Sequence, residues 1–132
     1  MSLPALLNTV RSHGMRVSTA RRLVLESLVA AGEPLTAEEL AGDADLASTY
    51  RNLETLESIG IVRHVHLGHG PGRYELADRH DGWTTCQDCG RSTPLPSPAL
   101  LAIRRAAREA AGFEPDFTHF ALIGRCSDCR GT

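Results

Sequence analysis

The sequence predicts an α+β fold made of two small modules. Helical periodicity runs through the N-terminal half, a β-hairpin pattern follows it, and two Cys-x2-Cys pairs occur in the C-terminal half. With 132 residues the chain has the size of one domain or of two small ones, so a large buried catalytic cavity is not expected.

Charge is unevenly distributed along the chain. The net charge is −2, every basic residue is an arginine, and Arg11, Arg16, Arg21 and Arg22 lie close together with no acidic residue between them. Such a cluster predicts either contact with nucleic acid or a solvated helix face. No apolar run approaches the roughly 18 residues of a membrane span, and the first residues lack a secretory signal, so we expect a cytoplasmic protein without membrane contact.

Apolar spacing and capping residues predict three helices before residue 45. The first has apolar residues at helical spacing, namely Leu3, Leu6, Leu7 and Val10. Ser18 is a suitable N-cap for the second. Thr36 and Glu39 have the spacing of a capping box, which predicts a short third helix. The inner face of the second helix is predicted to contain Ala20, Leu23, Val24, Leu28 and Ala31.

A fourth helix is predicted between Asp45, a suitable N-cap, and Gly60, which suits the left-handed position after a helix. Its two faces differ at 100° per residue. One face contains Leu46, Thr49, Leu53 and Leu56. The opposite face contains Ser48, Arg51, Asn52 and Thr55. The polar face has the side chains that a helix needs to read the major groove of DNA.

A β-hairpin is predicted directly after this helix, with strands at residues 61–67 and 73–77 and a glycine-rich turn between them. Helices followed by a hairpin describe a winged-helix domain over residues 1–77, in which the last helix enters the major groove and Arg73 of the wing lies near phosphate. A generic small α+β fold without DNA contact is the alternative.

Residues 78–82 are predicted to be a hinge, and residues 83–132 a second module. A strand is expected at 83–86, a helix over 98–111 with Ser97 as its cap and Gly112 as its stop, and a β-rich tail over 117–126. A module of this size buries little apolar surface, so it is expected to need a metal ion, a partner subunit, or both.

The four cysteines, Cys86, Cys89, Cys126 and Cys129, form two Cys-x2-Cys pairs. Two such pairs can complete a tetrahedral sulfur site that suits Zn²⁺, and four cysteines leave no open position for catalysis. A thioredoxin-like redox pair, or disulfides, are the alternatives. No common catalytic motif is present, so neither an enzyme nor a small organic substrate is expected.

Three histidines are candidates for a second metal site. His64 and His66 are two residues apart, so on a strand both imidazoles leave the same face, and His119 is a third ligand from the second module. Imidazole suits Ni²⁺, Zn²⁺, Cu²⁺ and Fe²⁺. The alternative is a hairpin with surface histidines, and His69 in the turn is predicted to contact solvent or phosphate.

Several segments together resemble the ferric uptake regulator (Fur) family of bacterial metal-responsive repressors. They are "GMRVSTARRLVLESL", "STYRNLETLESIGIV", "CQDC" and "CSDC", while "HVHLGHGPGRYELADRH" and "FEPDFTHFALIGRC" look closest to the nickel-responsive branch, Nur. The resemblance implies a homodimer, joined through the second module, that represses transcription by binding palindromic operator DNA when a regulatory metal bridges the two domains.

The resemblance also implies roles for individual residues. His64, His66 and His119 match the Ni²⁺ ligands of the nickel branch, while zinc- or iron-responsive regulators and peroxide sensors belong to the same family. Tyr50 and Arg51 match its DNA-contacting pair. Arg16 and Arg22 are the phosphate candidates.

Where family members usually carry further histidine ligands, this sequence departs from the pattern. The resemblance therefore leaves open a second regulatory site made from Glu33, Asp78, His80 and Asp81.

Overall fold

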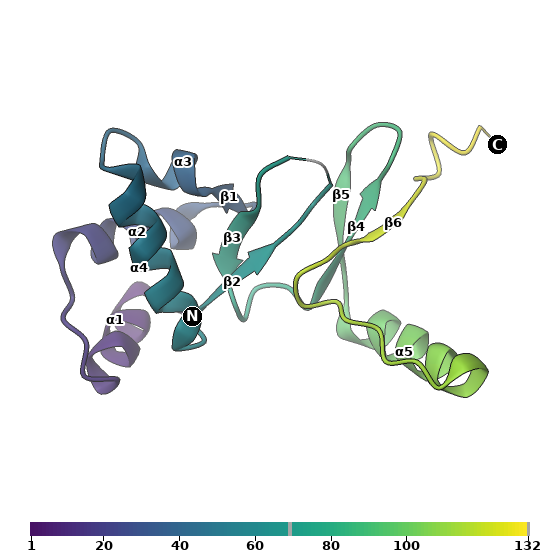
Figure 1. The fold of residues 1–132 in the computed structure, drawn as a ribbon, viewed down its shortest axis with the longest axis horizontal. Helices are drawn as coiled ribbons and strands as arrows, with labels where there is room; N and C mark the ends of the chain where they lie inside the picture. Colours follow the sequence, from purple (N-terminus) through teal and green to yellow (C-terminus); the bar gives the residue numbers. More distant parts are fainter. Residues whose placement is uncertain (69, 132) are drawn as a thin grey trace. The chain divides into compact units, whose positions relative to one another are not determined.

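The computed structural model describes residues 1–68 and 70–131, and it divides the chain into two compact units. Unit 1 contains Met1–His64 and Gly72–Arg79, and unit 2 contains Val65–Pro71 and the residues from His80 onward. Helices and strands occur in both units, which confirms the mixed α/β class (Figure 1). His69, predicted to contact solvent or phosphate, lies outside the described residues.

Unit 1 follows the predicted order of helices and hairpin. Its helices are α1 (Leu3–Ser12), α2 (Thr19–Ala30), α3 (Ala37–Ala41) and α4 (Leu46–Ser58). Its strands are β1 (Leu35–Thr36), β2 (Val62–Val65) and β3 (Arg73–Leu76), which form a sheet in the order β1-β3-β2. The last residue of β2, Val65, belongs to unit 2. The short strand β1, which sequence patterns did not predict, pairs antiparallel with β3 and places Leu35 opposite Tyr74.

Side-chain caps fix where these helices begin. Ser18 accepts a hydrogen bond from the amide of Arg21, and Asp45 accepts one from the amide of Ser48, so both predicted N-caps are confirmed. Thr36 and Glu39 form the predicted capping box. At the other end of α4, Gly60 has the predicted positive φ, of 83°.

The apolar core of unit 1 lies between α1, α2, α4 and the hairpin. The predicted inner face of α2 is partly wrong, because Leu23 is 55% exposed and Ala20 is also exposed, whereas Leu25 is fully buried. Val24, Leu25 and Leu28 are buried because they have the i, i+1, i+4 spacing of one helix face. At 100° per residue, Leu23 lies about 160° from Leu25 and about 140° from Leu28, so it is on the opposite side of the helix. Leu46 of α4 is likewise 38% exposed, since it occupies the first turn of its helix.

The C-terminal end of α2 is completed by a residue far away in the sequence. The helix has no basic residue in its own last turn, and Arg79 donates instead to the carbonyl oxygens of Leu28, Val29 and Ala31. A guanidinium at this end satisfies carbonyls that have no partner within the helix and complements the negative end of the helix dipole. Arg79 thereby holds the end of the hairpin against α2.

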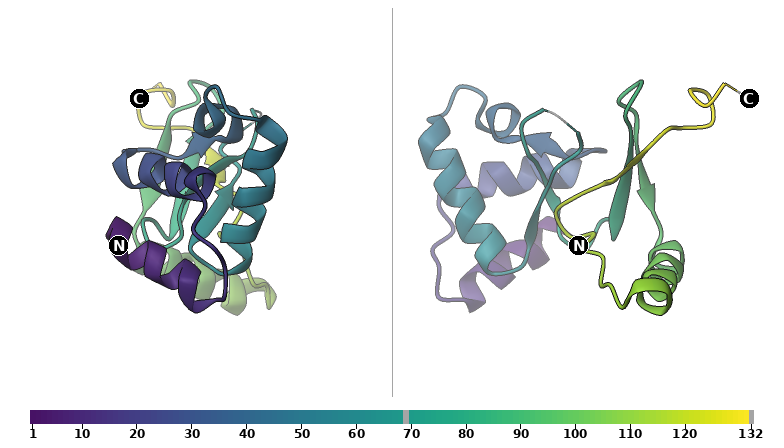
Figure 2. Two further views of the ribbon diagram at one scale, coloured as in Figure 1. Left: turned by 90° about the vertical axis from the view of Figure 1, so that its left-hand side faces the viewer. Right: turned by 45° about the vertical axis from the view of Figure 1, so that its right-hand side comes forward.

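Unit 2 is a small sheet with one helix. Strands β4 (Gly82–Cys86), β5 (Ser92–Leu95) and β6 (Leu122–Gly124) have the order β5-β4-β6, with β5 antiparallel and β6 parallel to β4. Helix α5 (Ser97–Ala111) lies at one end of this sheet (Figure 2). Buried Leu100 contacts the backbone at Gly82, and the Arg104 guanidinium lies 5.2 Å from the centre of the buried Phe117 ring.

The predicted cap of α5 is wrong by one residue. Pro96 is the N-cap, Ser97 is the first helical residue, and no side chain caps this end. The Pro96 carbonyl accepts from the amides of Ala99 and Leu100, so the first turn closes without a hydroxyl acceptor. The predicted stop at Gly112 is confirmed by its left-handed conformation, with φ 59°. Among the described helices, none is long and apolar enough to cross a membrane.

Candidate functional site

The four cysteines converge because β6 pairs with β4. Cys86 is the last residue of β4 and lies opposite Gly124 in the parallel register, and the amide of Gln87 donates to the Gly124 carbonyl. The chain then continues for two residues to Cys126, whose amide lies 3.4 Å from the Cys86 sulfur. Each pair closes in a turn, with the Gly90 amide bonded to the Cys86 carbonyl and the Cys129 amide bonded to the Cys126 carbonyl.

The resulting sulfur cluster is close in size to a tetrahedral metal site. All four sulfur atoms lie within 4.8 Å of one another, and the Cys89 and Cys126 sulfurs are 3.8 Å apart. A tetrahedron with Zn–S bonds of about 2.3 Å has sulfur–sulfur edges of about 3.8 Å. Cys86 is buried while Cys89 is exposed, and a hollow of about 220 Å³ borders Cys86 and Cys126.

The thiols of this cluster differ in acidity. Backbone N–H groups, first that of Cys89 and then that of Cys126, hold the pKa of Cys86 at about 6. The Arg91 guanidinium lowers the pKa of Cys126. Hydrogen bonds to the Cys126 and Cys86 sulfurs raise the pKa of Cys129 to about 12. Without metal the cluster therefore keeps a proton among its sulfurs, which a divalent cation would displace on binding.

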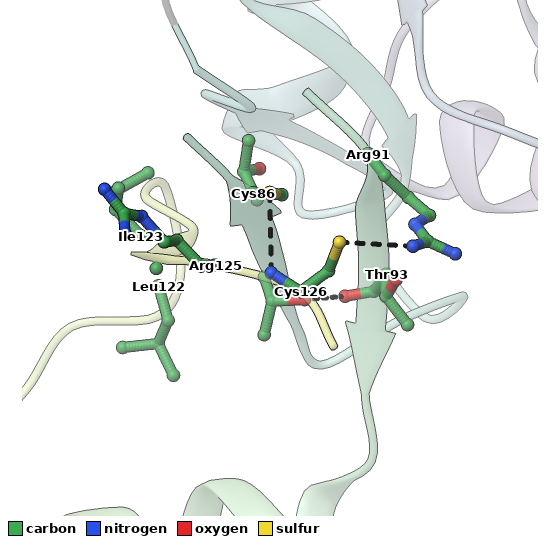
Figure 3. Close-up of a pocket in the computed structure, with 10 residues that line it drawn as sticks. Cys86, Arg91, Thr93, Leu122, Ile123, Arg125 and Cys126 are labelled. Carbon is green, nitrogen blue, oxygen red and sulfur yellow. Dashed lines mark hydrogen bonds between the residues drawn. The ribbon is translucent and has the colours of Figure 1, made fainter. Parts of the chain in front are cut away.

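Arg91 is a candidate site residue that sequence reasoning missed, because it lies directly beside the cysteine cluster. Its Nη2 lies 3.2 Å from the Cys126 sulfur (Figure 3). The same Nη2 lies 2.8 Å from Asp128 Oδ2, so the guanidinium charge faces the cluster. A Zn²⁺ ion with four thiolates has a net charge of −2, which a neighbouring guanidinium stabilises. A basic residue soon after the first Cys-x2-Cys pair was the sequence signal for this role.

The thioredoxin-like alternative lacks its main structural requirement. In such proteins the Cys-x2-Cys pair opens a helix, whose N-terminus lowers the thiol pKa. Here Cys86 ends β4 and Cys89 lies in the turn between β4 and β5, while Cys126 and Cys129 follow β6 in a loop and turn. All four cysteines are free thiols, so the disulfide alternative is not supported either.

Two of the three predicted histidine ligands lie on neighbouring segments of unit 2. The His66 amide donates to the His119 carbonyl over 2.6 Å, and His66 forms a parallel bridge with Phe120. The His66 ring stacks on the Phe120 ring, with centroids 5.3 Å apart and 17° between the planes. The structure therefore brings together the main chains of His66 and His119.

The third predicted ligand, His64, lies on β2 in unit 1. Its imidazole stacks on the ring of Tyr74, with centroids 4.8 Å apart and planes 9° from parallel. Among the described residues, the cysteine cluster is the one group whose ligand atoms already converge on a single metal position. The three-histidine site draws residues from both units and stays a prediction.

The residues of the second predicted regulatory site are also distributed over both units. Glu33 is exposed after α2, and Asp78 binds the N-terminal amine of Met1 at 3.3 Å. His80 contacts the edge of the Trp83 ring in unit 2, with centroids 4.7 Å apart, and Asp81 is exposed. This site likewise stays a prediction.

The polar face of α4 is presented largely as predicted. Arg51 and Tyr50 are exposed, and Arg51 Nη2 donates to Ser48 Oγ at 2.9 Å. Asn52 has a structural role as well, because its Oδ1 accepts from Arg21 Nε at 3.1 Å. Arg21 also donates to the Arg16 carbonyl at 2.7 Å, so it connects the loop before α2 to α4.

Two of the phosphate candidates have acidic partners in the same unit. Arg22 pairs with Glu26 one turn along α2, at 3.0 Å. Arg73 Nη1 lies 3.3 Å from both Glu39 Oε1 and the Pro34 carbonyl oxygen. The capping hydrogen bond from the Thr36 backbone N–H lowers the pKa of Glu39, so this carboxylate is ionised and able to hold Arg73.

Comparison with known proteins places the chain in one family. The model of the ferric uptake regulator family matches residues 12–122. The peroxide-responsive repressor PerR of Staphylococcus saprophyticus is 24% identical over 131 residues, covering 94% of this chain and 88% of the relative. The solved structure of the Helicobacter pylori ferric uptake regulator Fur superposes with a TM-score of 0.76 at 19% identity, covering 100% of this chain and 96% of the other. That of the Pseudomonas aeruginosa ferric uptake regulator with manganese gives 0.67 at 27% identity, with 91% and 96% coverage. The family match spans most of the sequence and the fold agrees with it, so this chain belongs to the ferric uptake regulator family.

Proposed function

We propose that this metal-responsive transcription regulator is a repressor that binds palindromic operator DNA as a homodimer when Ni²⁺ occupies a site formed by His64, His66 and His119. The cysteine cluster holds a structural Zn²⁺ ion. In this proposal unit 1 is the winged-helix domain that contacts DNA, and the second module joins the two chains of the dimer.

The observation that carries the regulatory site is the hydrogen-bonded pairing of the His66 and His119 segments. The 2.6 Å bond between their main chains keeps two imidazole-bearing residues on adjacent segments, and His64 is two residues before His66. Imidazole nitrogen is a good ligand for Ni²⁺, Zn²⁺ and Fe²⁺, and the resemblance to the nickel-responsive branch supports the choice of Ni²⁺ in this proposal. Three protein nitrogens leave further coordination positions for water or a carboxylate, as a six-coordinate ion requires.

Ligands supplied by both units explain how a bound ion changes DNA affinity. An ion shared by His64 and the other two histidines favours the arrangement of the units in which all three reach it. A shift of the DNA-competent population from 1:99 to 99:1 needs about 5.5 kcal/mol of differential binding. Structural zinc sites supply about 10–16 kcal/mol, so three imidazole bonds are sufficient in scale.

The exposed face of α4 is proposed to read the operator. Arg51, Ser48, Tyr50 and Asn52 present the donors and acceptors of a major-groove reader, and Arg51 suits a guanine base. Arg16, Arg22 and Arg73 contact phosphate. The pairs of Arg22 with Glu26 and of Arg73 with Glu39 are at least one-third exposed, so each is weak enough to exchange for a phosphate partner.

A peroxide-responsive repressor is the second candidate. It is favoured by the staphylococcal relatives, each of which is described as the peroxide-responsive repressor PerR at 24% identity. Under this alternative the same histidine site would hold Fe²⁺, and peroxide would abolish DNA binding by oxidising the site. A zinc- or iron-responsive regulator would instead respond to Zn²⁺ or Fe²⁺ without peroxide sensitivity.

Metal titrations of DNA binding distinguish these functions. Purified protein is analysed for metals, and its binding to duplexes selected from a random pool is then titrated with Ni²⁺, Zn²⁺, Fe²⁺ and Mn²⁺. We expect one retained zinc per chain and DNA binding stimulated most by Ni²⁺. His64→Ala should lose the stimulation and keep the zinc, while His13→Ala, a change at an exposed histidine of unit 1, should retain both.

A result with Fe²⁺-dependent binding that is lost on peroxide treatment would replace the nickel proposal with the peroxide-sensing one. Tightly bound zinc together with DNA binding that no added ion stimulates would contradict both the nickel proposal and the peroxide-sensing proposal.

A further inference from the structure

We infer that Gly72 is a positioning residue for the His64 imidazole, because the absence of a side chain at position 72 is what lets this ring lie flat against Tyr74. The inference deepens the proposed function and rests on it, since His64 is the unit 1 ligand of the proposed regulatory site.

The space that a side chain at position 72 would fill is already occupied by His64. A Cβ atom built on Gly72 would lie 1.9 Å from His64 Nε2, 2.8 Å from Cδ2 and 3.1 Å from Cε1. Real Cβ atoms essentially never approach another heavy atom below 3.0 Å. The imidazole therefore occupies the space that glycine leaves immediately before β3.

A face of the His64 ring is held by Tyr74, on which it stacks. Gly72 and Tyr74 are two residues apart, so they present to the same face of the strand, and β3 is the hydrogen-bonded neighbour of β2, which carries His64. Tyr74 is 6% exposed, so its ring is itself held by the core of unit 1. The stack at 4.8 Å and the glycine gap together restrict the rotamer of His64.

The conformation of Gly72 indicates that glycine is needed here for space rather than for backbone freedom. Gly72 does not have a positive φ, so an alanine at this position would not be strained by a left-handed backbone. The atom it would collide with is the tip of a side chain that can rotate away. Gly72→Ala should therefore displace the imidazole at little cost in folding stability, which separates a positioning effect from a structural one.

Gly70 provides the matched control. It lies in the same turn, and a Cβ built there meets no atom of the described residues within 4 Å. Gly70→Ala makes the same chemical change two residues away without touching His64.

The first readout does not depend on metal. When the regulatory site holds no metal, the Tyr74 ring current should shift the NMR signals of the His64 ring protons upfield. These signals are assigned by their loss in His64→Ala. Gly72→Ala should move this resonance toward the position of an unstacked histidine, and Gly70→Ala should leave it in place. An unchanged His64 resonance in Gly72→Ala would overturn the inference.

The second readout is Ni²⁺ affinity, measured by competition with a chelating dye on protein that retains its zinc. Residues that orient metal ligands typically change affinity by about 10- to 100-fold, and we expect a loss in that range for Gly72→Ala and none for Gly70→Ala. If His64→Ala weakens Ni²⁺ binding but Gly72→Ala does not, the positioning inference fails alone. If His64→Ala binds Ni²⁺ like the unmodified protein, the proposed ligand role fails and the inference falls with it.

Discussion

Removal of the cysteine-bound metal should unfold unit 2 and leave unit 1 folded. The buried apolar side chains that the structure describes in unit 2 are Val65, Trp83, Leu100 and Phe117, beside Cys86. At about 1.5–3 kcal/mol for each large side chain, these four contribute about 6–12 kcal/mol before the entropy of ordering the chain is subtracted. A structural zinc site contributes about 10–16 kcal/mol, which is comparable to or larger than this whole apolar contribution.

The folding of unit 1 should not depend on the metal, because its apolar core contains 14 buried residues from α1 to α4 and the hairpin. The chain has a single tryptophan, Trp83, which is 7% exposed in unit 2 and reports on that unit alone. Stepwise chelation should therefore shift Trp83 fluorescence to the red, while the far-UV circular dichroism of the unit 1 helices is retained.

Cys126→Ser should reproduce this effect without chelator, and Ser127→Ala, in the same turn, should not. If Trp83 emission is unchanged after complete removal of zinc, then unit 2 is stable without metal and the reasoning is refuted.

Three further substitutions test the architecture. Arg79→Ala removes the donor to three carbonyls at the end of α2 and should destabilise unit 1 by about 1–3 kcal/mol, measured by urea unfolding; an unchanged midpoint would contradict the capping role. Leu53→Ala, at a fully buried position, should cost about 2–5 kcal/mol, whereas Leu23→Ala, the same change at an exposed position, should cost less than about 0.5 kcal/mol, and equal costs would refute the corrected helix face. Arg91→Ala removes the cation beside the Cys126 sulfur and should weaken zinc retention by about 10- to 100-fold in competition with a chelator, an effect that a merely exposed arginine would not have.

Local sequence signals predicted the helices well. N-caps at Ser18 and Asp45, the capping box at Thr36 and Glu39, and the stop glycines Gly60 and Gly112 act over a few residues, so their chemistry is readable from sequence alone. The buried face of α2 was harder to predict, because which side of a helix is buried depends on the elements that pack against it. Leucines on either side of Val24 look alike in sequence, and only packing against α1 and α4 buries Leu25 and exposes Leu23.

The assembly of the candidate site could be predicted only in part, because it depends on pairings between segments far apart in the sequence. The spacing of the cysteines indicated a metal site, yet only the parallel pairing of β6 with β4 explains how Cys126 reaches Cys86. The roles of Arg91 and Gly72 depend on contacts across strands and turns, and they were not predicted from the sequence. Long-range contacts of this kind leave no periodic trace in the sequence, unlike helix faces and caps.

DNA-binding anisotropy with and without Ni²⁺ tests the central proposal most directly. Zinc-loaded protein is titrated onto a duplex selected in the presence of Ni²⁺, alongside His64→Ala and Arg51→Ala. The proposal predicts that Ni²⁺ strengthens binding by the unmodified protein, that His64→Ala binds DNA weakly at every Ni²⁺ concentration while retaining zinc, and that Arg51→Ala does not bind specifically. Equal DNA affinity with and without Ni²⁺, or full Ni²⁺ stimulation of His64→Ala, would contradict it.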